Sequence, residues 1–192
     1  MAEQVLTPVD QLPAEIARFL APKLPLLGPG RPELAFVEPL QQADPFRWKR
    51  STGAWSAEAA ACCRAGLWLW NGLLEESHVI SQAVQTAEGS WWHGIMHRRE
   101  PDAGNASYWF RRVGDHSLAG PLADRVRGHL ADRDIPAAAG WLQTAGRWDA
   151  VRFVDLCEQA RGRGDRLEHL AREVAAIEWY TLFNFCRGAA AG

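Results

Sequence analysis

The 192-residue sequence lacks most of the motifs that assign an activity to a protein. It has no glycine-rich loop to cradle a phosphate, no G-x-S-x-G nucleophile motif and no internal repeat. No apolar run approaches the length of a membrane-spanning helix, and the opening residues, MAEQVLTPVDQLP, lack the basic flank and apolar core of a signal peptide. We therefore expect a cytoplasmic protein with no membrane partner.

The sequence also has few cysteines and a small net charge. The four cysteines are Cys62, Cys63, Cys157 and Cys186, and none forms a C-x-x-C pair, which disfavours cysteine-based zinc or redox chemistry. We expect them to be buried, reduced thiols. The formal net charge is −2, so the sequence lacks the positive charge typical of nucleic-acid binding. No nucleic-acid partner is expected, and the sequence is compatible with a homo-oligomer.

Strand-like alternation of polar and apolar residues is absent over any length, whereas helical periodicity recurs along the chain. The sequence therefore predicts an all-α fold, a single-domain irregular helical bundle. Residues 1–50 predict an extended, proline-rich N-terminal arm with one short helix, anchored on the body by Phe46 and Trp48, and residues 51–192 predict the helical domain. The strongly apolar segment 57–70 predicts the central buried helix.

Side chains that can bind a metal or an anion, or transfer a proton, concentrate in residues 89–116, GSWWHGIMHRREPDAGNASYWFRRVGDH. These 28 residues hold three of the six histidines and four arginines. Pro101 stops one predicted helix, over 87–99, because its ring blocks the helical conformation of the preceding residue. A second predicted helix covers 103–113 and ends at Gly114. The two would form a helical hairpin.

Three side chains of the first predicted helix share one face. His93, His97 and Glu100 fall at i, i+4 and i+7, and two histidines at i, i+4 can ligate the same divalent metal. His78, on a preceding short helix, is the candidate third metal ligand, with Glu100 or His116 as alternatives. The zinc-protease motif itself is absent, because glycine follows His93.

The same stretch suggests a polar pocket for a small anionic molecule, gripped by guanidinium groups. In that hypothesis His93 or His97 acts as a general acid or base, oriented by Glu100 or by Glu178 of the predicted last helix, 165–187. Glu178 interrupts an apolar face and needs a partner, either an arginine of the hairpin or the histidines. The expected ligand-binding residues are His78, Arg98, Arg99, Asn105, Tyr108, Arg111 and Arg112.

Four segments, SHVISQ, the 89–116 stretch, WDAVRFVDLCEQA and EWYTLFNFC, together resemble an uncharacterised family of small soluble bacterial and fungal proteins. The likeness covers roughly residues 67–186, and its most specific part is HRREPD…NA.YWFRRVG.H. No activity is assigned to that family, so the resemblance implies a single domain with this stretch as its signature and implies no mechanism. Where the signature often continues with proline after its last histidine, this chain has Ser117.

Two functions stay open from the sequence. One is a ligand-binding protein, with metal-assisted hydrolysis as its activity if a divalent metal is bound. The other is a non-catalytic protein in which the His/Arg/Glu cluster is a structural network and which acts by binding another protein. A separate alternative is that at least one arginine of each adjacent pair, Arg98–Arg99 and Arg111–Arg112, pairs with Glu100, Asp102 or Asp115 on a solvated face. Exposure of His93, His97 and Arg111 on a concave pocket would favour the first.

Overall fold

A computed structural model describes residues 12–21, 23–49 and 55–189. Within these ranges the chain is all-α and contains no strand. None of the helices described is both long and apolar enough to cross a membrane. The α-helices are α1 (Ala14–Ala17), α2 (Val37–Gln42), α3 (Ala57–Trp70), α4 (Leu74–Ala83), α5 (Ala87–Arg99), α6 (Ala103–Val113), α7 (Ala119–Leu130), α8 (Ala150–Ala160) and α9 (Arg166–Asn184).

Short polar residues begin five of the longer helices. In each case the side-chain oxygen accepts a backbone N–H of the first turn, which would otherwise lack a partner. These residues are Ser56, Thr86, Asp102, Asp149 and Asp165. The bounds expected for α5 and α6 are confirmed, and α6 ends as predicted at a glycine with φ of 68°.

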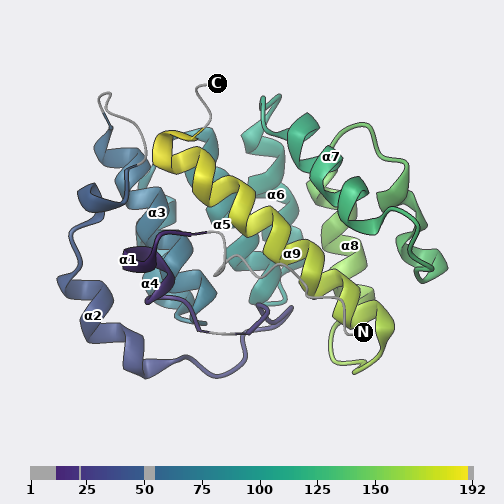
Figure 1. The fold of residues 1–192 in the computed structure, drawn as a ribbon, viewed down its shortest axis with the longest axis horizontal. Helices are drawn as coiled ribbons and strands as arrows, with labels where there is room; N and C mark the ends of the chain where they lie inside the picture. Colours follow the sequence, from purple (N-terminus) through teal and green to yellow (C-terminus); the bar gives the residue numbers. More distant parts are fainter. Residues whose placement is uncertain (1–11, 22, 50–54, 190–192) are drawn as a thin grey trace.

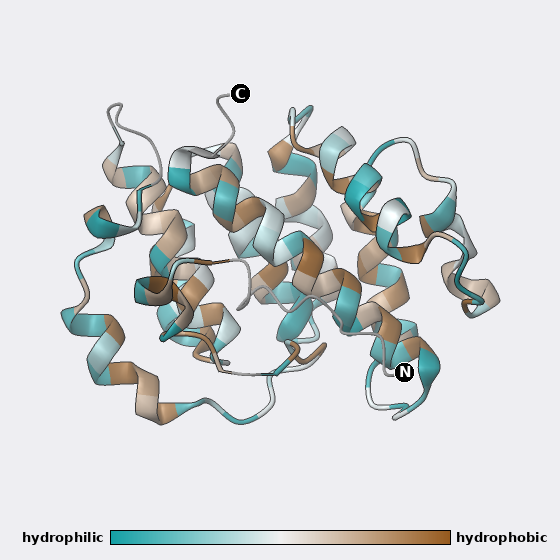
Figure 2. Cartoon of the chain, viewed as in Figure 1, coloured by the Kyte–Doolittle hydropathy of each residue, from teal (hydrophilic) through white to brown (hydrophobic). Residues whose placement is uncertain are grey.

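The helices form two hairpins and a covering helix (Figure 1). The α3–α4 hairpin packs on the α5–α6 hairpin through α4 and α5, α8 packs on α6, and α9 contacts α3, α7 and α8. Teal and brown alternate along α9 in Figure 2, as expected for an amphipathic helix. This arrangement places α5 between the α3–α4 hairpin and α6.

Helix α5, rather than α3, is the most completely buried element. Every residue from Gly89 to Arg99 is buried, although the segment contains two histidines and two arginines. The helix predicted over 57–70 is buried as expected and contacts α2, α4, α5 and α9, but the fuller burial of α5 was not predicted. Hydrophobicity alone favoured α3, whereas the polar side chains of α5 find partners inside the protein.

A glycine sets the distance between α5 and α6. A Cβ built on Gly94 would lie 2.9 Å from two ring atoms of Phe110, closer than packed atoms tolerate. The absence of a side chain at Gly94 thus lets the two helices approach closely.

The N-terminal arm packs against the helices through buried apolar residues, including Ile16, Leu40 and Trp48. Its described residues, 12–21 and 23–49, form two short α-helices, α1 and α2, where one was predicted. Phe46 is 52% exposed, so its predicted anchoring role was wrong, whereas Trp48 is buried as expected.

Arginines of the helical body hold the arm by its backbone. Arg172 donates to the carbonyls of Leu24 and Pro25, and Arg161 donates to that of Leu27. Charge-assisted bonds to carbonyl oxygens need no particular side chain on the arm. The sequence of the arm therefore gives little sign of how it is held.

Candidate functional site

Three histidines converge between α4 and α5. His78, His93 and His97 each present a ring nitrogen, and these three atoms all lie within 4.8 Å of one another. The Nε2 atoms of His93 and His97 are 2.9 Å apart. One turn of helix brings these two rings together, and the packing of α4 on α5 adds the third.

The outer nitrogens of the pair are already bonded. Ser81 Oγ lies 3.3 Å from the carbonyl of His78 and 3.2 Å from Nδ1 of His93. A carboxylate oxygen of Glu100 lies 3.0 Å from Nδ1 of His97. The tautomer in which each ring carries its one N–H at Nδ1 donates to these two oxygens and leaves a lone pair on both Nε2 atoms, which a metal ion can bind. With an N–H at one Nε2 instead, the two rings are hydrogen-bonded to each other at 2.9 Å.

The pKa of His93 supports a neutral ring at this position. Burial, followed by the nearby charges of His97 and His78, lowers the pKa of His93 to about 4. A metal ligand must present its lone pair, so a histidine that stays neutral near pH 7 is ready to bind.

The cluster lies just below the surface. His93 and His97 are 1% and 8% exposed, whereas His78 is half-buried and the side chain of Glu100 is 44% exposed. The indole of Trp109, on α6, covers the ring of His93 at a centroid distance of 4.1 Å. His78 contacts both other rings, and its ring nitrogens have no hydrogen-bond partner among the described residues. Access from solvent is therefore past His78 and Glu100.

Glu178 takes the first of its two expected partners, an arginine of α5. Arg98 Nη2 lies 2.5 Å from its Oε2, and both side chains are buried. Its Oε1 accepts from Trp91 Nε1 at 3.0 Å and from Trp148 Nε1 at 3.2 Å. Because both oxygens are bonded in this way, Glu178 joins α9 to α5 as a structural residue. It contacts no histidine in these bonds, so its expected role in orienting a catalytic histidine is not supported.

The arginines of α5 are not on a solvated face. Arg98 and Arg99 are 2% and 5% exposed. Arg99 donates to the carbonyls of Leu69 and Gly28, and burial with the neighbouring charge of Arg98 lowers its pKa to about 10. The alternative of surface ion pairs for these two residues was wrong, because the helix that carries them is enclosed.

The four expected ligand-binding residues of α6 point in different directions. Arg112 lies over the rings of Tyr108 and Trp109, near the histidines, and Tyr108 is 51% exposed. Asn105 bonds to the capping carboxylate of Asp102. Arg111 lies elsewhere, at a separate cleft, because successive helical residues are about 100° apart.

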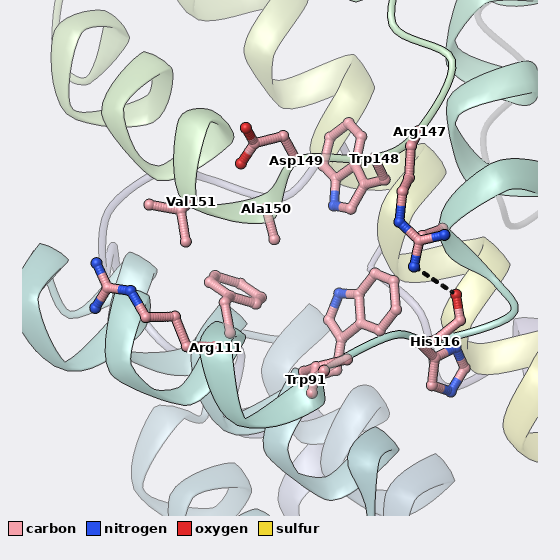
Figure 3. Close-up of a pocket in the computed structure, with 12 residues that line it drawn as sticks. Trp91, Arg111, His116, Arg147, Trp148, Asp149, Ala150 and Val151 are labelled. Carbon is pink, nitrogen blue, oxygen red and sulfur yellow. Dashed lines mark hydrogen bonds between the residues drawn. The ribbon is translucent and has the colours of Figure 1, made fainter.

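That cleft has a volume of about 460 Å³ and lies where α5 and α6 meet the starts of α7 and α8 (Figure 3). It is lined by Trp91, Arg111 and His116 from the 89–116 stretch and by Arg147, Trp148 and Asp149. None of the three clustered histidines lines it. The single pocket expected from the sequence is thus divided between two places, and the contribution of residues 147–149 was missed.

His116 is engaged at both nitrogens. Its Nδ1 accepts from the backbone N–H of Leu118 at 3.1 Å, and its Nε2 lies 3.2 Å from Glu88. This bond lowers the pKa of Glu88 to about 2. His116, which the sequence offered as an alternative third metal ligand, therefore lies outside the group of three histidines.

No family model, curated protein or solved structure matched the chain.

Proposed function

We propose that His78, His93 and His97 bind one divalent metal ion and that the bound metal activates water for hydrolysis of a small anionic substrate. The observation that carries the proposal is the convergence of three ring nitrogens within 4.8 Å of one another, with Nδ1 of His93 beside Ser81 and Nδ1 of His97 beside Glu100. Such outer bonds, to a carboxylate and a hydroxyl, are typical of metal-binding histidines, because they fix the ring and its tautomer.

The geometry fits a first-row metal. With metal–nitrogen distances of about 2.0–2.1 Å, two nitrogens at 2.9 Å subtend about 90° at the metal, and a tetrahedral angle needs a separation of about 3.3 Å. For this pair, a shift of a few tenths of an ångström reaches either angle. The nitrogens of the full set lie within 4.8 Å of one another, so binding by His78 requires its ring to move closer by up to about 1.5 Å. Three imidazoles favour zinc, iron, nickel or copper over magnesium or calcium, which prefer oxygen ligands.

Three protein ligands leave a coordination position for water or substrate. A bound metal can lower the pKa of such a water to about 7 and so supply hydroxide at neutral pH. Glu100, by accepting from His97, would make that ring a stronger ligand. Arg112, exposed beside Trp109, is placed to attract an anion toward this side of the protein.

The experiment is a competition titration of the purified protein with zinc and a chromogenic chelator. His93→Ala and His97→Ala should each weaken zinc binding at least a hundredfold, and His78→Ala by a smaller factor. His169→Ala is the matched control, since His169 is exposed and lies outside the cluster. Equal zinc affinity in all four variants would overturn the proposal.

The non-catalytic alternative rests on a specific observation. His93 and His97 are nearly sealed and lie within hydrogen-bond distance of each other, as expected for a buried structural network rather than for an open pocket. A proton in place of the metal would join Glu100, His97 and His93 into one hydrogen-bonded chain. In that case zinc would leave the melting temperature unchanged, whereas a metal site predicts a rise with zinc concentration.

A further inference from the structure

The cleft beside α8 has rigid aromatic walls. Trp91 and Trp148 both donate their indole N–H to the same oxygen of Glu178, at 3.0 and 3.2 Å. Glu178 is itself held by Arg98. The two indoles therefore keep their positions whether or not the cleft is occupied, and the apolar side chains of Phe110 and Val151 extend the same surface.

Positive charge lies at the two ends of this apolar surface. Figure 3 shows Arg111 at one end and Arg147 at the other, with the tryptophans between them. Arg147 pairs with Asp115 and donates to the carbonyl of His116. Arg111 is exposed and has no ion pair among the described residues. An uncommitted guanidinium beside an aromatic floor is suited to a carboxylate on a flat ring.

The acids near the cleft are already engaged. Asp149 accepts from the backbone N–H of Arg152, where it begins α8. Glu88 is bonded to His116. Asp115 is paired with Arg147. Asp149 keeps its negative charge at the α8 end of the cleft, and Arg111 is the lining cation without an ion-pair partner among the described residues, so an anion binds best at Arg111.

We propose that this cleft binds a flat aromatic carboxylic acid, with its ring between Trp91 and Trp148 and its carboxylate on Arg111. The volume of about 460 Å³ lies within the range of roughly 300–1,000 Å³ found for small-molecule sites. The site is separate from the histidine cluster and does not depend on a metal.

The test uses 1-naphthoate as the probe, titrated into the full chain by calorimetry in the presence of a chelator. The neutral analogue 1-naphthylmethanol has the same ring and no charge. Arg111→Gln removes the guanidinium at an exposed position, and Arg125→Gln is the matched control, since Arg125 is an exposed arginine of α7 that lies over Tyr180 and does not line the cleft. Val151→Trp fills the cleft, and its thermal unfolding is recorded to confirm folding.

The proposal expects 1-naphthoate to bind at least tenfold more tightly than the alcohol. Arg111→Gln should weaken naphthoate about ten- to a hundredfold, leave the alcohol unchanged, and so abolish the discrimination. Arg125→Gln should bind like the original chain, and Val151→Trp should bind neither compound. Equal binding of acid and alcohol, or equal loss in both arginine variants, would overturn it. Undiminished binding by folded Val151→Trp would place the ligand elsewhere and overturn it as well.

Discussion

Replacing Glu178 by glutamine should cost more stability than most single substitutions. The residue is 0% exposed, and its carboxylate accepts from Arg98, Trp91 and Trp148. The amide oxygen of glutamine can still accept from the indoles, but its NH2 group then faces the guanidinium of Arg98. Leaving that buried cation unpaired costs about 3–5 kcal/mol. The total free energy of unfolding of a domain is only about 5–15 kcal/mol.

The assay is urea and thermal unfolding. A loss of that size corresponds to a melting temperature lower by about 6–20 °C, at about 2–4 °C per kcal/mol for a chain of this length. Asp134→Asn is the control. It removes an exposed pair with Arg166 and should cost at most about 1 kcal/mol.

A double variant tests the reason given. Combining Arg98→Met with Glu178→Gln removes the unpaired cation, so the double variant should be more stable than Glu178→Gln alone. The buried ion pair does not anchor α9 as argued if Glu178→Gln loses no more stability than Asp134→Asn. The same holds if the loss of the double variant equals the sum of the losses of Arg98→Met and Glu178→Gln measured singly.

Three further predictions concern other parts of the fold. Because the pKa of Glu88 falls from 4.5 to about 2 in the folded protein, its contribution is complete above pH 4.5 and is lost as pH falls toward 2. For a partly exposed group this amounts to ~1–2 kcal/mol, and Glu88→Gln should flatten acid denaturation curves over that interval. Glu100→Gln should weaken zinc binding about 10–100-fold while leaving its stoichiometry unchanged, as measured by chelator competition. Gly94→Ala should destabilise by about 1–3 kcal/mol in urea, since its Cβ would meet the facing ring of α6, whereas Gly120→Ala meets nothing and should be neutral or stabilising.

Local signals were enough to predict the helices around the histidines. Thr86 and Asp102 begin α5 and α6 as N-caps, and Gly114 ends α6, because each meets a backbone requirement within a few residues. The i, i+4 spacing likewise placed His93 and His97 together. These inferences need no knowledge of the tertiary fold.

Contacts between segments far apart in the chain could not be predicted from the sequence patterns. Helical spacing placed Glu178 on an apolar face but left its partner open between arginine and histidine, and only the packing of α9 selects Arg98. The cleft depends on Arg147 and Trp148, which lie in a loop and gain their position from the meeting of α6 and α8. Burial of α5 was missed for the same reason, since hydrophobicity does not record that an arginine will find carbonyl partners.

The measurement that tests the central claim most directly is elemental analysis of tag-free protein purified without chelator. A metal centre at His78, His93 and His97 predicts close to one equivalent of a first-row metal per chain, and its loss in the His93→Ala variant but not in His169→Ala. A protein that holds no metal as purified, and none after incubation with each ion in turn, would contradict the claim. The cluster would then be a proton-linked structural network.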